Sequence, residues 1–340
     1  MGSSIVVLST HRLPDEAVEV LKGRVDLEVL REPSRSMLEE AIERADVLIA
    51  GFMGIDGEVI ARGRRLKLIV ARSSGVDHID VEAAERRGVC VANQPEAIAE
   101  AVSEHVVGLI LASYRRIVEG NQYTVAGEWY SSRRFLRGVT VRGKVLGIVG
   151  MGRIGVLTAY KMRMLGVSRI IYYSRRRKRE VEQLLHAEPG SLERIFREAH
   201  IIVVALPYTR ETRGLIGYNL LSTMRPGALF INVGRGPVVD EEALAKVLAE
   251  REDLRAALDV YASEPLPPDS PLARLSGTGR VILTPHHAGG TDASLVETSI
   301  LAARQVLHFL ETGSVWNPVN SACREATDVP GLWDPLDRAI

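Results

Sequence analysis

At 340 residues the chain exceeds the usual length of one domain, so two domains with separate cores are expected. Apolar residues make up 46% and charged residues 25% of the sequence, which are ordinary values for a globular protein. The formal net charge is zero and no apolar run is long enough to cross a bilayer, so we expect neither a nucleic acid nor a membrane as partner. The N-terminus does not resemble a secretory signal, and we expect a cytoplasmic protein.

The two cysteines, Cys90 and Cys323, are too few and too far apart in the sequence to suggest a disulfide framework or a metal-binding knuckle. We therefore predict no disulfide framework and no metal site. Of the 43 basic residues only six are Lys. Because arginine is so frequent, a run of arginines is weak evidence for a binding site unless a second feature supports it.

The first hundred residues alternate short apolar runs with amphipathic patterns. The runs at 5–8, 27–30, 47–50, 68–71 and 89–92 predict strands, and segments such as 15–22 and 37–44 predict helices between them. Strand and helix in alternation predict a parallel sheet that is covered by helices.

A longer apolar helix is predicted at 97–116, and a polar, aromatic stretch follows at 120–138. A second alternating series then predicts six strands, at 145–149, 169–173, 201–206, 228–233, 255–260 and 281–284. Six parallel strands suffice for a complete dinucleotide-binding sheet.

The last predicted helix, at 291–312, is closed by Gly313 and followed by an irregular, Pro-rich tail. One helix and a tail are too little for a third domain, so we expect them to pack on the first. The predicted domains are a substrate domain of residues 1–100 and 291–340 and a dinucleotide-binding domain of residues 101–290.

The pattern Gly150-Met151-Gly152-Arg153-Ile154-Gly155 stands between a predicted strand and a predicted helix. In that context glycines allow a tight turn and the close approach of a pyrophosphate to the backbone, and the helix N-terminus attracts its charge. The sequence therefore predicts a dinucleotide site here.

The end of the next strand bears on which nicotinamide cofactor is used. An NAD site has an acidic residue there, whereas this strand ends in Ser174-Arg175-Arg176 followed by more basic residues. Guanidinium groups suit a 2′-phosphate. The general excess of arginine in this sequence could explain the basic run, but it does not explain why the acidic residue of an NAD site is missing. We expect NADP(H) to be preferred, with NAD(H) as the alternative.

Polar residues follow the later strands of this series: Arg235 after the fourth, Asp259 and Glu264 after the fifth, and His286 after the sixth. Ligands of open α/β sheets bind outside the carboxyl ends of the strands, so these side chains are expected to share one site. Reduction of a carbonyl by hydride needs a proton donor, for which His is suited, and a cation for the oxygen.

Several stretches resemble the D-2-hydroxyacid dehydrogenase family: residues 150–155, NVGRGPVVD at 232–240, LDVYASEP at 258–265, TPHHAGG at 284–290 and, in the first domain, SSGVDHID at 73–80. The resemblance extends over nearly the whole chain, and motifs in this order are highly specific. It implies an α/β fold of two Rossmann-like, doubly wound parallel-sheet domains with the active site in a cleft between them. It also suggests a homodimer formed through the nucleotide domain.

The resemblance implies that His286 is the general acid/base, Glu264 its carboxylate partner, Arg235 the residue that binds and polarises the substrate, and Asp259 a contact of the nicotinamide. His287 departs from the aliphatic residue usual in the family, but the position directly after Thr284-Pro285 favours His286 as the acid. Ser74, Gly75 and Val76 would bind the substrate carboxylate, and the apolar Phe52 and Met53 would face its 2-substituent. The expected cofactor contacts are Gly150, Gly152, Arg153, Ile154, Gly155, Ser174, Arg175, Arg176, Leu206, Pro207, Val233, Gly234, Asp259, His286 and Ala288.

Within the family the chain is most similar to glyoxylate/hydroxypyruvate reductases, so a small 2-oxo or 2-hydroxy acid is the expected substrate. Phosphoglycerate dehydrogenases without a regulatory domain and D-lactate-type enzymes are alternatives. A second class is also open, because corepressors of this fold use the dinucleotide to sense redox state and assemble partners. Turnover of glyoxylate at ordinary enzyme concentration would separate an enzyme from such a binding protein.

Overall fold

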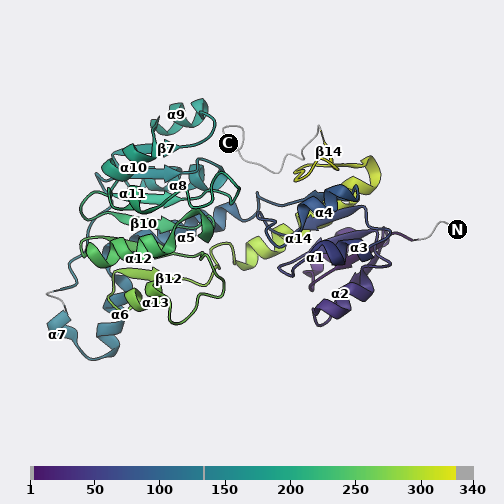
Figure 1. The fold of residues 1–340 in the computed structure, drawn as a ribbon, viewed down its shortest axis with the longest axis horizontal. Coiled ribbons are helices and arrows are strands. Elements are labelled where there is room, and N and C mark those ends of the chain that lie inside the picture. The colour runs from purple at the N-terminus through teal and green to yellow at the C-terminus, as the bar shows by residue number, and fades with distance from the viewer. Residues whose placement is uncertain (1–3, 133–134, 327–340) are drawn as a thin grey trace. The chain divides into compact units, whose positions relative to one another are not determined.

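The computed structural model describes residues 4–132 and 135–326 of the chain. These residues separate into two compact units, one of residues 4–98 with 290–326 and the other of residues 99–289 (Figure 1). The predicted substrate domain runs to residue 340, and its last part, 327–340, lies outside the described residues.

The first unit contains a five-stranded parallel sheet in the order β2-β1-β3-β4-β5. Strand β3 shows why helices cover both faces, because Val47 and Ile49 enter one hydrophobic core while Leu48 and Ala50 enter another. The strands are β1 (Val6–Ser9), β2 (Asp26–Val29), β3 (Val47–Ala50), β4 (Leu68–Ala71) and β5 (Cys90–Ala92), and the helices between them are α1 (Asp15–Leu21), α2 (Arg35–Ala41), α3 (Gly57–Arg62) and α4 (Val81–Arg86).

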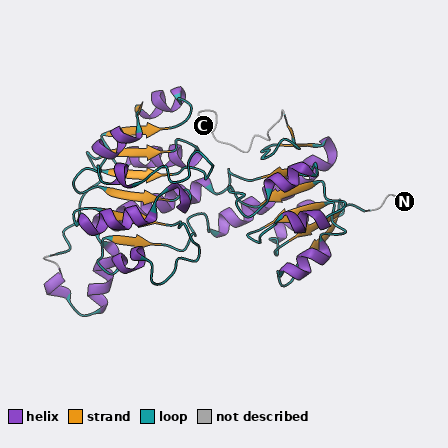
Figure 2. Cartoon of the chain, viewed as in Figure 1, coloured by secondary structure: helices purple, strands orange, loops and turns teal. Residues whose placement is uncertain are grey.

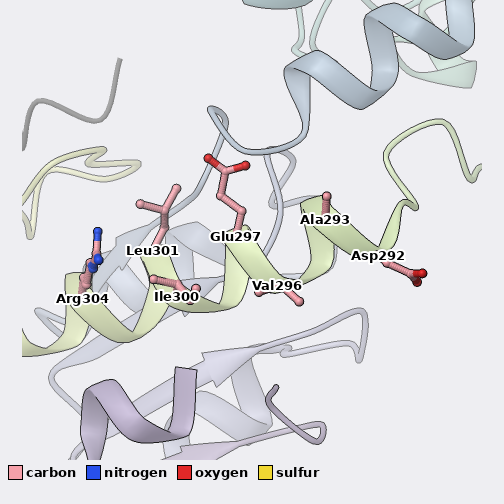
Figure 3. A pocket seen from close by; sticks show the side chains of 7 residues that line it. All are labelled: Asp292, Ala293, Val296, Glu297, Ile300, Leu301 and Arg304. Carbon is pink, nitrogen blue, oxygen red and sulfur yellow. The ribbon is translucent and has the colours of Figure 1, made fainter. Parts of the chain in front are cut away.

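Helix α14 (Asp292–Thr312) belongs to this unit and packs against α1 and β4. Its limits agree with the prediction, since Thr291 caps the first turn together with Ser294 and Gly313 ends the helix in a left-handed conformation. A hollow of about 480 Å³ runs along the helix (Figure 3). Leu301 and Glu297 point to the same side of the helix there, and burial raises the pKa of Glu297.

The segment after α14 corrects two expectations. It is not wholly irregular, because β13 (Ser314–Val315) pairs in parallel with β14 (Arg324–Glu325). Cys323 forms a disulfide with Cys90 of β5, although 233 residues separate them in the sequence. Asn320 reinforces the contact by accepting a hydrogen bond from the Val91 N–H and donating one to the Val89 carbonyl. Separation along the chain was a poor guide because α14 returns the chain to β5.

The second unit contains a seven-stranded parallel sheet in the order β12-β11-β10-β9-β6-β7-β8. Six of its strands were predicted, and the edge strand β8 was not. It is three residues long and ends in Pro189, so it lacks the apolar run by which a strand is recognised. The strands are β6 (Val145–Val149), β7 (Arg169–Tyr173), β8 (Ala187–Pro189), β9 (Ile201–Val204), β10 (Leu229–Asn232), β11 (Arg255–Leu258) and β12 (Val281–Leu283).

Helices cover both faces of this sheet as well (Figure 2). Along β9, Ile202 and Val204 enter one core and Ile201 and Val203 the other, so the sheet is doubly wound as predicted. The stretch 120–138, predicted only as polar and aromatic, contains most of helix α6 and the whole of helix α7. The helices of the unit are α5 (Ala99–Arg115), α6 (Ile117–Val125), α7 (Trp129–Ser132), α8 (Arg153–Met164), α9 (Arg179–Leu185), α10 (Leu192–Glu198), α11 (Tyr218–Leu221), α12 (Glu241–Glu250) and α13 (Pro271–Ser276).

Candidate active site

The glycine loop connects β6 to α8 at the carboxyl edge of the seven-stranded sheet. Gly150 has a φ of +107°, and a Cβ there would lie 2.6 Å from the carbonyl oxygen of Ala205. A Cβ at Gly155 would lie 2.3 Å from the carbonyl oxygen of Gly150, so this glycine lets α8 pack against the loop. Gly152 is the N-cap of α8, and nothing lies within 4 Å of the position that its Cβ would take. The exposed helix N-terminus therefore fits the pyrophosphate of a dinucleotide.

The basic residues after β7 divide into two groups. Arg177 donates hydrogen bonds to both carboxylate oxygens of Glu182, at 2.8 to 3.0 Å, and lowers the pKa of that carboxyl. Glu182 also accepts a hydrogen bond of 2.6 Å from the Tyr172 hydroxyl, so it is held against the strand. Arg175 and Arg176 are exposed and Ser174 is half-buried. Arg177 is thus engaged within the fold, a distinction that the run of arginines in the sequence does not make.

His286 lies in the loop after β12 with a φ of 49°, which is uncommon for a residue other than glycine. Its Nδ1 is 2.6 Å from Oε2 of Glu264. The other oxygen of Glu264 accepts a hydrogen bond of 3.0 Å from the Tyr261 N–H, which orients the carboxylate. A carboxylate on Nδ1 orients the imidazole and leaves Nε2 as the nitrogen for proton transfer.

Asp259 is the buried anchor of this histidine loop, with 1% of its surface exposed. It accepts hydrogen bonds from the Thr284 hydroxyl at 2.6 Å and from the N–H groups of His287 and Ala288 at 3.1 and 2.9 Å. Since the Thr284 side chain before His286 and two backbone N–H groups after it donate to one carboxylate, Asp259 fixes the position of the histidine. The sequence had suggested only a contact with the nicotinamide.

Two further residues of the site were not identified from the sequence. His105 of α5 has its Nε2 3.3 Å from the Thr284 hydroxyl, and its ring lies 4.9 Å from that of His287; burial lowers its pKa. Glu241 accepts a hydrogen bond from the Ala262 N–H, and burial raises its pKa, with Glu264 adding to the effect. His105 lies in an apolar helix that gave no signal, whereas Glu241 directly follows the NVGRGPVVD stretch.

Arg235 follows β10 and its loop lies against the loop that carries Glu264. A Cβ at the next residue, Gly236, would lie 1.8 Å from the carbonyl carbon of Tyr261, so only glycine fits. The side chain of Asn232 donates to the Arg235 carbonyl at 3.2 Å, which secures the turn. A Cβ at Gly234 would similarly meet the carbonyl oxygen of Leu206, at 2.5 Å. The predicted residues of the second unit are thus held on adjoining loops at one edge of its sheet.

The predicted substrate contacts of the first unit also follow its strands. After β4 the Ser73 hydroxyl donates to the Gly75 carbonyl at 2.7 Å, and Asn93 donates to the Ser74 carbonyl at 2.6 Å. After β3 the side chain of Phe52 is 78% exposed, while Met53 packs on the core. The carboxyl edge of this sheet therefore holds a braced turn and an exposed apolar side chain.

Two classes of site have no support in the described part of the chain. No group of three or more His, Cys, Asp or Glu residues there could hold a metal ion. None of the described helices is both long enough and apolar enough to span a membrane.

Comparison with known proteins places these features in a family. Residues 107–288 match the family model described as D-isomer specific 2-hydroxyacid dehydrogenase, NAD binding domain. The glyoxylate reductase of Aeropyrum pernix is 40% identical over 338 residues, covering 96% of this chain and 98% of that protein. The solved structure of the TT0316 protein from Thermus thermophilus has a TM-score of 0.82 at 36% identity and covers 93% of this chain and 100% of that one. A glyoxylate reductase structure from Paecilomyes thermophila has a TM-score of 0.83 at 26% identity, covering 93% and 98%.

The family match covers the glycine loop, Arg235, Glu264 and His286, and the relative from Aeropyrum pernix aligns with almost all of both units. The NAD binding domain of the family model includes the glycine loop, and the solved structures agree with the doubly wound sheets. This chain belongs to the D-isomer specific 2-hydroxyacid dehydrogenase family and is an oxidoreductase that uses a nicotinamide cofactor.

Proposed function

We propose that this protein is a glyoxylate/hydroxypyruvate reductase in which His286 is the general acid. The observation that carries the proposal is the 2.6 Å contact between His286 Nδ1 and Glu264, held at the sheet edge that also carries the glycine loop and Arg235. The match to the relative from Aeropyrum pernix covers 98% of that protein, which is a glyoxylate reductase, and this supports the choice of substrate.

The roles of the side chains follow from their chemistry. The bound nicotinamide supplies the hydride for the 2-oxo carbon. His286 Nε2 donates the proton to the alkoxide oxygen, and Glu264 stabilises the imidazolium before that transfer. The Arg235 guanidinium polarises the carbonyl oxygen and binds the substrate carboxylate, and Asp259 keeps the histidine loop in place. The Ser74, Gly75 and Val76 amides are proposed to bind the carboxylate.

The size of the substrate is tested by a panel of 2-oxo acids. Phe52 and Met53 are apolar, so we expect kcat/KM to be higher for glyoxylate and hydroxypyruvate than for 3-phosphohydroxypyruvate. A highest value for the phosphorylated acid would identify a phosphoglycerate dehydrogenase instead. Absence of turnover for the whole panel at ordinary enzyme concentration would favour a dinucleotide-sensing binding protein.

We further propose that NADPH is preferred over NADH through Ser174, Arg175 and Arg176. Glu182, which contacts Tyr172 of β7, is already engaged by Arg177 and by that tyrosine. Arg175 and Arg176 are exposed beside Ser174 and can donate hydrogen bonds to a 2′-phosphate. Each charge-assisted contact contributes about 1.5–3 kcal/mol, or on the order of ten- to a hundred-fold in affinity.

The double variant Ser174→Asp/Arg175→Ile tests this preference. It should weaken NADPH strongly and recover NADH, because the new carboxylate repels the phosphate and accepts from the ribose hydroxyls. The matched control is Arg197→Ile, which removes an exposed arginine from the last turn of α10 and should leave the ratio of the two kcat/KM values nearly unchanged. Equal use of both cofactors by the wild-type enzyme would contradict the proposal.

A homodimer is proposed from the surface that carries Val125, Tyr130 and Phe135. Val125 is 81%, Tyr130 86% and Phe135 63% exposed, and neighbouring apolar exposed side chains of this size commonly mark an interface. A second copy of the chain is the proposed partner. Light scattering should give twice the mass of the chain for the wild type and a lower mass for Val125→Asp/Tyr130→Ser; a wild-type monomer would contradict it.

A further inference from the structure

A pocket lined by cationic side chains lies at the edge of the seven-stranded sheet opposite the candidate active site. Lys144 directly precedes β6, His200 directly precedes β9, and Arg255 opens β11. The candidate catalytic residues follow the other ends of β10, β11 and β12 in the same sheet. With four to five residues per strand at about 3.3 Å each, the two edges are about 15 Å apart. The volume of the pocket is about 300 Å³.

Positive charge in this pocket greatly exceeds negative charge. Its one lining carboxylate, Asp253, accepts hydrogen bonds of 3.0 and 2.7 Å from Arg251, which lowers its pKa to about 2. Arg255 is paired with the buried Glu119 at 3.3 Å. Within residues 4–132 and 135–326, no carboxylate forms an ion pair with any of the other four cations, which are Arg116, Arg137, Lys144 and Arg225.

Arginines elsewhere at this edge have a different explanation, because they cap the ends of helices and strands. Arg280, for example, donates from one nitrogen to the carbonyls of Leu248, Arg251 and Leu254 at 3.1 to 3.3 Å. Arg225 makes one such contact, of 3.4 Å, to the Glu198 carbonyl. Its Nε is buried and has no hydrogen-bond partner among the described residues. Arg225 is thus held by fewer backbone contacts than Arg280, and its Nη1 also lies 3.2 Å from the Nδ1 of His200.

His200 reports the electrostatic environment of the pocket. Its Nδ1 accepts a hydrogen bond of 3.0 Å from the Val145 N–H, which requires the neutral ring. Burial, together with the charges of Arg225 and Lys144, lowers its pKa to about 4. At neutral pH the histidine therefore adds no charge of its own, and the cations around it remain without a counter-charge.

We propose that this pocket binds a small phosphorylated anion, separately from the dinucleotide. Guanidinium groups bind phosphate oxygens in a fork geometry, and Lys144 adds a point charge beside them. A volume of about 300 Å³ is at the low end of small-molecule sites, which suits a ligand of one or two phosphate groups. Because the expected cofactor contacts lie at the opposite edge of the sheet, a bound dinucleotide does not fill it.

Calorimetric titration of the cofactor-saturated enzyme with pyrophosphate, at constant ionic strength, tests the proposal. Saturation with cofactor removes the glycine loop as a competing site. The variant Arg137→Met/Lys144→Met removes two exposed or half-buried cations of the pocket, and Arg64→Met/Lys67→Met removes the same two residue types from exposed positions in the other unit. We expect saturable binding by the wild type and the control, and about ten-fold or greater loss for each pocket cation removed.

Two results would overturn the proposal. One is a wild type that does not bind pyrophosphate, or a pocket variant that binds it as tightly as the control. The other is a wild-type dimer that binds no pyrophosphate and a pocket variant that is monomeric. That result would show that the cations of the pocket pair with a carboxylate of a second copy of the chain. Thermal unfolding of both double variants checks that each is folded.

Discussion

At the scale of single residues, the conformation of His286 separates it from its neighbour His287. His286 has a left-handed φ of 49° and faces Glu264, whereas the Nδ1 of His287 is 3.6 Å from Asp259 and its ring stacks edge-on with His105. A left-handed conformation costs free energy for a residue with a Cβ, so the surrounding contacts must hold it. Asp259 supplies them through the N–H groups of His287 and Ala288.

We predict that His286→Ala lowers kcat by about 10²–10⁴-fold, because general acid catalysis contributes that much. The dissociation constant of the cofactor should change little, since the dinucleotide is expected to bind mainly at the glycine loop. The companion variant His287→Ala keeps the backbone N–H that Asp259 accepts and should retain most of the activity. Stopped-flow rates and fluorescence titration of both variants measure the two effects; a larger loss in His287→Ala would reverse the assignment.

At the scale of elements, each sheet carries a half-buried histidine that is neutral at physiological pH. His11 follows β1, and burial lowers its pKa to about 4, helped by the charge of Arg72. His200 precedes β9 and is in the same condition. Both folded-state pKa values lie below the unfolded value of 6.5, so the unfolded chain binds more protons between pH 4 and 6.5. Stability from these histidines is therefore complete above pH 6.5 and is lost as the pH falls toward 4.

His200→Gln should reduce this acid sensitivity, because glutamine can accept the Val145 N–H without titrating. Between pH 7 and pH 5 we expect the wild type to lose about 1 kcal/mol more free energy of unfolding than the variant, after allowing for partial solvent screening. Urea midpoints at the two pH values provide the measurement. The same decrease in wild type and variant would show that His200 is protonated in the folded protein.

At the scale of the whole molecule, residues from the two ends of the described chain form one unit. The Cys90–Cys323 bond joins β5 to the segment after α14, with the two Cα atoms 4.6 Å apart. Disulfides are rare in reducing compartments except in hyperthermophilic organisms. A bond that closes so long a stretch of chain restricts the unfolded state strongly.

Replacing both cysteines by serine should lower the free energy of unfolding by about 2–5 kcal/mol. Thermal unfolding with and without a reductant measures the effect. The reductant should destabilise the wild type and leave the double variant unchanged. Two free thiols titrated in the unreduced, denatured wild type would show that the bond does not form.

The sequence by itself determined the features that depend on neighbouring residues. The glycine loop was recognisable because its strand, turn and helix are contiguous, and α14 because Thr291 and Gly313 mark its ends. The apolar runs identified every strand with two buried faces, since burial on both sides requires continuous apolar sequence. The family motifs marked His286, Glu264 and Arg235 because each lies in a loop that follows a strand.

Only the tertiary structure decided the features that join distant parts of the chain. Whether Arg177 or Arg175 is available depends on where Glu182 of α9 lies, and His105 joins the site because α5 passes beside Thr284. The bond between Cys90 and Cys323 and the cationic pocket each combine residues that are more than a hundred positions apart. Such contacts leave no local pattern in the sequence, because hydrophobic periodicity and capping signals depend only on residues within one helix or strand and its flanking turns.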